Sequence, residues 1–266
     1  MTRALSSEPA IQWYPGHMAR AMRRLTEDLT AVDAVIEVVD ARVPHTGANA
    51  ALATLAPQKA HLLVFSRENA AEPRATERWV ELAREGGRDT VAIDAKSRSG
   101  SARLRAALET LPHRRPSARA IVVGIPNAGK STVINALVGR AVARTEDRAG
   151  VTRAPQWFRV TPVFEIMDTA GILVPKIDGR EAQWKLALVG AVPRARFDPE
   201  DVAGRLWSWL EAHGRDDVPT LETFAQQRGF LRRGTLVDTH NAAWSYIKAF
   251  NEGTFGRVTL DDPPSA

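Results

Sequence analysis

The first two thirds of the chain alternate between short apolar runs and longer stretches with helical spacing. Several apolar runs contain almost no polar residue, which is typical of strands buried on both faces of a sheet. Six strands are therefore predicted, at residues 34–40, 61–65, 90–93, 118–123, 157–160 and 163–168. Helical patterns lie between several of them, at residues 18–29, 75–84, 101–111 and 130–138. Strands that alternate with helices predict an α/β domain with six mainly parallel strands.

The strand pattern ends after Pro175, and the remaining chain is predicted to be helical. Residues 199–211, 220–228 and 238–251 have helical spacing. Asp198, Thr220 and Asp238 stand close to the starts of these helices, where a short polar side chain caps the first turn. The change of pattern divides the chain into an α/β domain, residues 1–178, and a small α-helical domain, residues 179–266.

The composition is that of a globular protein, with 44% hydrophobic and 25% charged residues among 266. Cysteine is absent, which excludes disulfide scaffolds, thiolate zinc sites and cysteine catalysis. The first ten residues lack the apolar run of a signal peptide, and no stretch approaches the ~18 apolar residues of a membrane span. We therefore expect a cytoplasmic protein without a membrane partner.

The charge is unevenly distributed along the chain. The net charge is +5, but residues 1–177 carry +7 and residues 178–266 carry −2. A polyanionic partner such as RNA is therefore expected mainly on the first two thirds. Arginine supplies 30 of the 36 basic residues, which suits phosphate binding but is equally consistent with a bias in codon composition.

The strongest motif is a phosphate-binding loop. Residues 124–131 (GIPNAGKS) fit G-x-x-x-x-G-K-[ST] and lie between a predicted strand and a predicted helix, which is the context that the motif requires. The glycines allow backbone N–H groups to face phosphate oxygens, Lys130 reaches the β- and γ-phosphates, and Ser131 holds Mg²⁺. The predicted nucleotide contacts here are Gly124, Asn127, Ala128, Gly129, Lys130, Ser131 and Thr132.

Two downstream motifs complete a predicted phosphate and metal site. Asp168 ends a strand and opens the sequence Asp-Thr-Ala-Gly, so that it can organise Mg²⁺ while Gly171 senses the γ-phosphate. Thr152, in the sequence AGVT, has the position of the Mg²⁺-binding threonine of a switch loop. The predicted metal ligands are therefore Ser131, Thr152 and Asp168, and Lys130 and Thr152 are also expected to act in catalysis.

The base-reading loop is expected before the phosphate-binding loop. No Asn-Lys-x-Asp sequence follows Gly171, but Ser66-Arg67-Glu68-Asn69 follows the predicted strand 61–65. A second loop on the base side, Asp94-Ala95-Lys96, follows the next strand. Ser66, Arg67, Asn69, Asp94, Ala95 and Lys96 are the predicted base-side contacts. The order of the elements is thus circularly permuted relative to an ordinary guanine-nucleotide fold.

Several motifs together resemble the YlqF/RbgA family of circularly permuted GTPases that assist assembly of the large ribosomal subunit. The resemblance rests on WYPGHM at residues 13–18, DARVP at 40–44, GIPNAGKS, AGVT and DTAGI, and extends to QRGFLRRG and GTFGRVTLD near the end. It implies a GTP-hydrolysing switch that binds GTP or GDP with Mg²⁺ and contacts rRNA in the precursor of the large subunit, helped by its C-terminal domain. We expect a monomer with no DNA partner.

The resemblance also suggests catalytic and cation-binding residues. Ile172 follows the Asp-Thr-Ala-Gly sequence, where many GTPases have a glutamine that positions water. The family points instead to the histidine of Pro-Gly-His-Met, which is His17, although a histidine before a helix is often only a capping or surface residue. Asn127 resembles the asparagine that the family links to K⁺, although residue type alone makes it a turn former.

Three features depart from the family pattern. The base loop is SREN rather than Asn-Lys-x-Asp, alanine replaces the proline that the family prefers before Gly171, and the C-terminal module is shortened. The first matters most, because the Asn69 amide would meet the exocyclic amine of guanine donor to donor. This clash weakens the selectivity for guanine. Alternatively, backbone groups of Ala95 and Lys96 compensate for it, and the selectivity is kept. A pseudo-GTPase that only binds RNA, and an NTPase of relaxed base choice, are the alternative functions.

Arginines are the candidate contacts to RNA. On the predicted helix 18–29, Met18, Ala21, Met22, Leu25 and Leu29 should pack inward, which leaves the arginines towards the other side. Any one arginine is an ordinary surface residue, but together they favour RNA binding through the phosphates. The candidates are Arg20, Arg23, Arg24, Arg114, Arg115, Arg119, Arg144, Arg148, Arg153 and Arg159, with a smaller cluster of Arg228, Arg232 and Arg233.

Overall fold

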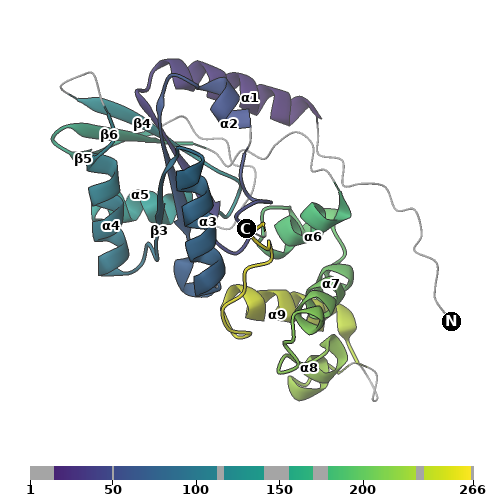
Figure 1. Cartoon of the computed structure of the whole chain (residues 1–266). Helices are drawn as coiled ribbons and strands as arrows, with labels where there is room; N and C mark the ends of the chain where they lie inside the picture. Colours follow the sequence, from purple (N-terminus) through teal and green to yellow (C-terminus); the bar gives the residue numbers. More distant parts are fainter. Residues whose placement is uncertain are drawn as a thin grey trace.

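The fold is an α/β sheet domain followed by a group of helices (Figure 1). The computed structural model describes residues 15–49, 51–112, 117–140, 156–169, 179–231 and 237–264. The predictions for Thr152 and Gly171 lie outside these residues, and side chains are described from Arg23 onward, so the side chain of His17 also lies outside them. In the described residues no helix is long and apolar enough to cross a membrane.

The six predicted strands form one sheet in the order β3-β2-β1-β4-β6-β5. All neighbouring pairs are parallel except β5 with β6. The predicted α/β class and the mainly parallel sheet are therefore confirmed. The strands are β1 (Ala34–Asp40), β2 (Ala60–Ser66), β3 (Asp89–Ala92), β4 (Ala118–Val123), β5 (Gln156–Thr161) and β6 (Phe164–Asp168).

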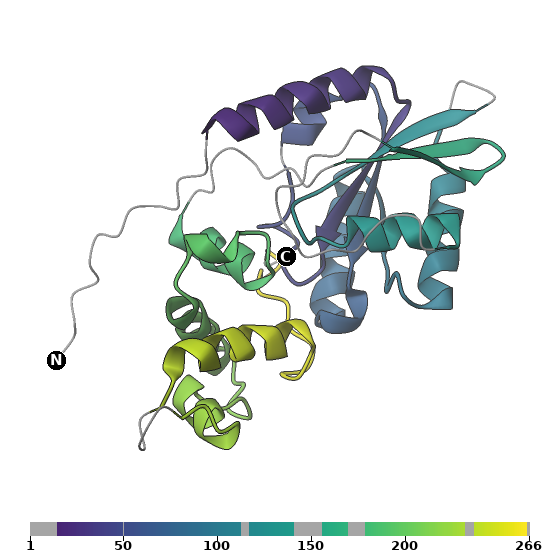
Figure 2. The ribbon, with the colours of Figure 1, turned by 180° about the vertical axis from the view of Figure 1, so that it is seen from behind.

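Helices cover both faces of the sheet (Figures 1 and 2). Leu25 and Leu29 pack with Val35 in one cluster, which covers one face, whereas Leu104 and Val133 pack with the opposite face. Alternate residues of β1 thus enter different cores, as the two-residue period of a strand requires. The helices are α1 (Pro15–Thr30), α2 (Ala51–Leu55), α3 (Pro73–Glu85), α4 (Arg98–Glu109) and α5 (Lys130–Val138).

One predicted helix has shifted bounds for a local reason. The pattern predicted residues 101–111, whereas α4 begins at Arg98 and ends at Glu109. The Ser97 side chain accepts a hydrogen bond from the Gly100 backbone N–H at 2.9 Å and so caps the helix three residues earlier. The predicted start ignored this cap because the apolar spacing begins only later.

The C-terminal part consists of helices that we call the helical unit, residues 179–231 and 237–256. It contains α6 (Arg180–Leu188), α7 (Pro199–Ala212), α8 (Leu221–Gln227) and α9 (Thr239–Asn251). Asp198, Thr220 and Asp238 are the N-caps of the last three, as predicted. Helix α6 was not predicted, because Gln183 to Leu188 are all buried and a helix buried on every side has no amphipathic period.

The chain end returns to the sheet domain. Residues 258–261 lie against it, with the Leu260 N–H donating to Arg42 O at 2.7 Å and the Val258 N–H to Ala70 O at 3.0 Å. The Asp261 carboxylate accepts hydrogen bonds from the Thr46 N–H at 2.7 Å and from Lys185 Nζ of α6 at 3.1 Å. The last residues therefore connect the helical unit to the sheet.

Candidate functional site

The predicted site loops meet at one edge of the sheet. Strands β1, β2, β3, β4 and β6 are parallel, so their carboxyl ends lie on the same side, where α/β folds bind ligands. The loop after β4 is the phosphate-binding loop, Asp168 ends β6, and the two base-side loops follow β2 and β3. Circular permutation thus changes the order along the chain while the loops still converge.

Two glycines of the phosphate-binding loop occupy positions that a side chain would not fit. At Gly124 a Cβ would lie 2.2 Å from the Val38 carbonyl oxygen of the neighbouring strand, and φ is +155°. Gly129 has φ of +94° and is the N-cap of α5, where no side chain caps the helix. An uncapped helix start that points to this sheet edge is suited to bind phosphate.

Lys130 is buried behind the loop that it follows. Its Nζ donates to the carbonyl oxygens of Ile125 at 2.9 Å and Gly124 at 3.2 Å. Burial lowers the pKa of Lys130 to about 8, and the charge of nearby Asp168 only partly opposes this shift. The ammonium group is therefore destabilised in the protein alone, and an anion such as phosphate would relieve that cost.

Asp168 and Ser131 supply oxygen ligands of the kind that Mg²⁺ prefers. Burial raises the pKa of Asp168, while Lys130 and the N–H of Thr169 act in the opposite direction. The Thr169 hydroxyl donates to the Val122 carbonyl oxygen at 2.6 Å and so ties the end of β6 to β4. Both Asp168 and Ser131 are half-buried, and the residues present fit a magnesium ion bound together with phosphate.

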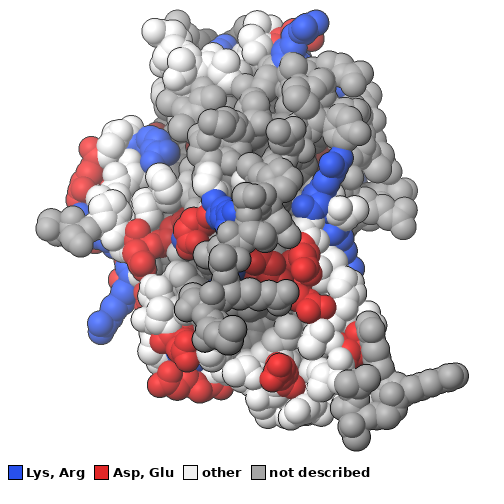
Figure 3. All heavy atoms as spheres, turned by 90° about the vertical axis from the view of Figure 1, so that its right-hand side faces the viewer, with Lys and Arg blue, Asp and Glu red and all other residues white. Residues whose placement is uncertain are grey.

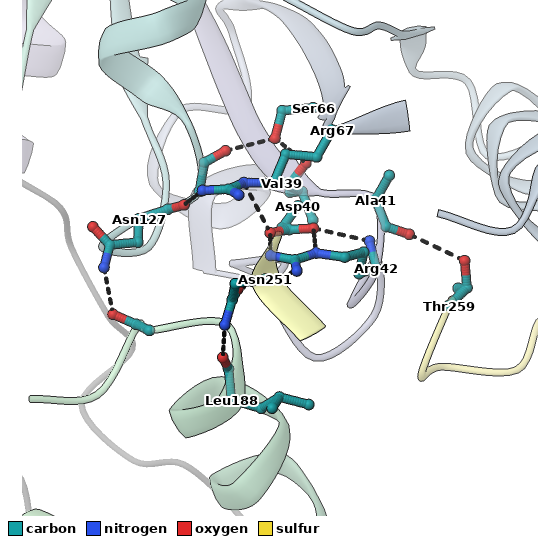
Figure 4. Close-up of polar contacts among 12 residues, drawn as sticks. Val39, Asp40, Ala41, Arg42, Ser66, Arg67, Asn127, Leu188, Asn251 and Thr259 are labelled. Atoms are coloured by element: carbon teal, nitrogen blue, oxygen red, sulfur yellow. Dashed lines mark hydrogen bonds and ion pairs between the residues drawn. The ribbon is translucent and has the colours of Figure 1, made fainter. Parts of the chain in front are cut away.

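Two side chains of the SREN loop, Ser66 and Arg67, contact the phosphate-binding loop (Figure 4). The Ser66 hydroxyl donates to the Ala128 carbonyl oxygen at 2.6 Å, and Arg67 Nη2 donates to the Asn127 carbonyl oxygen at 3.4 Å. Glu68 pairs with Arg103 of α4. Asn69 is exposed, and no side-chain hydrogen bond joins it to the part of the chain that is described.

The second base-side loop is joined to the first. The Glu68 N–H donates to the Ile93 carbonyl oxygen at 3.2 Å. Asp94 Oδ1 accepts a hydrogen bond from the Lys96 N–H at 3.0 Å, and Lys96 itself is exposed. The structure therefore brings the loop of Asp94, Ala95 and Lys96 next to the SREN loop.

Two residues beneath the site were seen only as part of the DARVP motif and had no predicted role. Asp40 and Arg42 form a buried pair, with Arg42 Nη2 2.7 Å from Asp40 Oδ2. Although burial acts to raise it, Arg42 and Arg67 hold the pKa of Asp40 below its ordinary value. Their spacing in Asp-Ala-Arg is the signal available in the sequence, since a charge at the end of a buried strand requires a partner.

The candidate RNA contacts are only partly described. Arg23, Arg24, Arg119, Arg159 and Arg228 are exposed. Figure 3 shows the molecule from the side of the helical unit. In the middle and lower part of this surface, the acidic side chains form larger patches than the basic ones. The side chain of Arg20, and Arg114, Arg115, Arg144, Arg148, Arg153, Arg232 and Arg233, lie outside the described residues.

Known proteins resemble this chain over nearly its whole length. Residues 119–194 match the family described as 50S ribosome-binding GTPase. Ribosome biogenesis GTPase A of Priestia megaterium is 34% identical over 96% of this chain and 98% of that protein. The mitochondrial ribosome-associated GTPase 1 of Mus musculus is 33% identical over 97% of this chain and 92% of its own.

Solved structures agree with the sequence comparison. The crystal structure of GNP-bound YlqF from T. maritima has a TM-score of 0.75 and 27% identity, covering 93% of this chain and 100% of that one. A GDP-bound YlqF structure has a TM-score of 0.72 and 28% identity, covering 91% and 99%. With the permuted order of the site loops, these similarities show that the chain belongs to the YlqF/RbgA family, the ribosome biogenesis GTPase A proteins.

Proposed function

We propose that this protein hydrolyses GTP and acts as an assembly factor for the large ribosomal subunit, with nucleotide state controlling its affinity for the pre-ribosome. The observation that carries the proposal is the phosphate-binding loop, which stands with Lys130 and Asp168 at the ligand-binding edge of a permuted sheet. The family described as 50S ribosome-binding GTPase, matched by residues 119–194, supports the large subunit as the target.

The phosphate side of the site is assigned as follows. The backbone from Gly124 to Thr132 cradles the phosphates, and Lys130 neutralises their charge after leaving its two carbonyl partners. Ser131, Thr152 and Asp168 hold Mg²⁺, which supplies charge stabilisation when bound, and Gly171 senses the γ-phosphate. K⁺ is an accessory cation near Asn127.

His17 is proposed to orient the attacking water. The backbone of His17 lies in the first turn of α1. An imidazole can accept or donate a proton near neutral pH, and Ile172, at the position of the usual glutamine, cannot. Thr152 is proposed to contribute to catalysis as a ligand of Mg²⁺.

The RNA partner is proposed to bind mainly the sheet domain, residues 1–178. The exposed arginines Arg23, Arg24, Arg119 and Arg159 support this, because arginine pairs with phosphate through two parallel hydrogen bonds. The helical domain, residues 179–266, is proposed to add a local contact through Arg228 and its neighbours rather than a broad basic surface. We propose that the protein acts as a cytoplasmic monomer.

One experiment tests the function against its alternatives. Steady-state hydrolysis of GTP, ATP and XTP is measured with and without large ribosomal subunits. GTP hydrolysis that increases with the subunit supports the proposal. Binding to the subunit without hydrolysis of any nucleotide would indicate a pseudo-GTPase, and similar rates with all three would indicate an NTPase of relaxed base choice.

Relaxed base choice is the second candidate, and one observation favours it. Ser66 contacts the phosphate-binding loop, Arg67 pairs with Asp40 and Glu68 pairs with Arg103. Asn69 is exposed and makes no side-chain hydrogen bond to the described part of the chain. Asn69 lacks the two acceptor oxygens of a carboxylate, so it pairs less well with the two donors of guanine.

A further inference from the structure

Asn127 of the phosphate-binding loop is held from two sides (Figure 4). Its Nδ2 donates to the Gly190 carbonyl oxygen of the helical unit at 2.8 Å. Its own carbonyl oxygen accepts a hydrogen bond from Arg67 Nη2, in the base loop, at 3.4 Å. One residue of the loop therefore contacts both the base side of the site and a unit that begins more than fifty residues later.

A second set of contacts joins the end of α6 to the sheet domain. Asn251 Nδ2 of α9 donates to the Leu188 carbonyl oxygen at 2.7 Å, two residues before Gly190. Asn251 Oδ1 accepts a hydrogen bond from Arg42 Nη1 at 3.1 Å, and Arg42 pairs with Asp40. Because Arg67 Nε also lies 3.4 Å from Asp40 Oδ2, these contacts form a closed ring that returns to Asn127.

The centre of this ring is a buried ion pair. The side chains of Asp40 and Arg42 are each only 1% exposed, and Arg42 lies over the Phe250 ring at 5.0 Å. A buried ion pair is costly to separate, because each charge would be left without its partner in a medium of low polarity. This pair joins the end of β1 to Asn251, which in turn holds the end of α6.

Asn127 is the member of the ring that belongs to the phosphate-binding loop. Its φ of +60° is left-handed, a conformation that asparagine tolerates better than most residues but that still needs support from its surroundings. The backbone at this position sets the direction of the adjacent N–H groups of the loop. We propose that Gly190 positions the phosphate-binding loop through Asn127, so that nucleotide binding and docking of the helical unit stabilise each other.

This coupling rests on the proposed nucleotide-binding function. It adds that the position of the helical unit controls the affinity for the nucleotide. A coupling free energy is reciprocal, so a macromolecule that displaces the helical unit must also weaken nucleotide binding. Conversely, the bound nucleotide must stabilise the end of α6. The helical unit is then part of the nucleotide site rather than only a separate docking module.

A pair of glycine variants isolates the contact. Gly190 has φ of +78°, and a Cβ there would lie 2.9 Å from Asn127 Nδ2, so Gly190→Ala must displace that side chain. Gly214 has φ of +70° in the same helical unit, and no atom lies within 4 Å of its virtual Cβ. Gly214→Ala therefore introduces a similar backbone strain without touching the site.

The measurement is the Kd of a fluorescent GDP. Gly190→Ala is expected to bind about five- to tenfold more weakly than Gly214→Ala, which corresponds to one lost hydrogen bond. Asn251→Ala, whose side chain contacts Arg42 rather than the phosphate-binding loop, is expected to weaken GDP in the same direction. In wild type, GDP is expected to slow hydrogen exchange at residues 185–190, and Gly190→Ala is expected to lose this protection.

Two outcomes would overturn the inference. If Gly190→Ala binds GDP as tightly as Gly214→Ala, or more tightly, Gly190 does not position the loop. If wild-type protein fails to bind GDP, the proposed function falls and the coupling falls with it. If wild-type protein binds GDP and the two glycine variants bind it with equal affinity, the coupling is rejected while the proposed function stands.

Discussion

The phosphate side and the base side of the site use different kinds of chemistry. On the phosphate side the essential features are backbone geometry at Gly124 and Gly129 and one buried lysine. On the base side they are side chains, and Ser66, Arg67 and Glu68 each pair with a neighbouring residue. A backbone cradle depends on a few glycines, whereas base recognition changes with each side chain.

The site combines a full phosphate motif with an unusual base loop. Ser66 and Arg67 still hold the phosphate-binding loop through its carbonyl oxygens. The first two positions of the base loop thus support the phosphate-binding loop, and Asn69 is the position with an exposed side chain. The comparison predicts that changes on the phosphate side affect turnover and that changes at Asn69 affect the choice of base.

The largest effect is expected from Lys130→Ala. The variant loses the cation that neutralises the phosphates, so GTP turnover should fall by about 10²- to 10³-fold or more. Steady-state hydrolysis measures this, and circular dichroism checks that the fold is intact. Lys248→Ala, at an exposed position of α9, is the matched control. Unchanged turnover of Lys130→Ala would refute the assignment of the phosphate-binding loop.

His17→Ala is expected to have the next largest effect. If His17 positions water, turnover should fall by about 10²-fold or more with little change in nucleotide affinity. Hydrolysis with large ribosomal subunits, together with GDP titration, separates the two quantities. His240→Ala, on the exposed side of α9, serves as the control. Equal losses of rate and binding would assign His17 a structural role.

The base side is tested by Asn69→Asp. Xanthine has a carbonyl where guanine has its exocyclic amine, so the Asn69 amide should accept XTP and GTP with poor discrimination. The aspartate should shift preference towards GTP by several-fold to about a hundredfold. Competition against fluorescent GDP measures the shift. Tight GDP binding by wild type, with XDP weaker by about tenfold or more, would show that Asn69 does not read the base.

A moderate change in stability is expected from Ser66→Ala. The variant leaves the buried Ala128 carbonyl oxygen without its donor at 2.6 Å, which should lower the free energy of unfolding by about 1–3 kcal/mol. Urea unfolding measures this, and Ser208→Ala, on the exposed surface of α7, is the control. Equal stability of the two variants would mean that Ser66 does not support the loop.

The smallest effect is a proton taken up on binding. In the protein alone burial lowers the pKa of Lys130 to about 8, so the lysine is about half protonated at pH 8. A bound phosphate raises this pKa, so GDP binding at pH 8 should take up at most about half a proton, and affinity should fall as the pH rises further. Calorimetry in buffers of different ionisation enthalpy measures the uptake, which Lys130→Ala should abolish.

Much of this protein can be predicted from local patterns in its sequence. Strands buried on both faces are continuous apolar runs, and Asp198, Thr220 and Asp238 cap helices through contacts within a few residues. The phosphate motif is also local, since its glycines and Lys130 act on adjacent backbone. The order of motifs along the chain was sufficient to predict circular permutation, because parallel strands present all their carboxyl ends on one side.

Other features depended on packing between distant segments. Helix α6 has no amphipathic period because it is buried on all sides, and Gly190 contacts Asn127 only because α6 ends beside the phosphate-binding loop. Arg42 likewise meets Asn251, which lies 209 residues later. The sequence determined the strands, the caps and the phosphate chemistry, since these arise from neighbouring residues. The tertiary structure alone decided how the helical unit contacts the site, because such contacts require folded segments to meet.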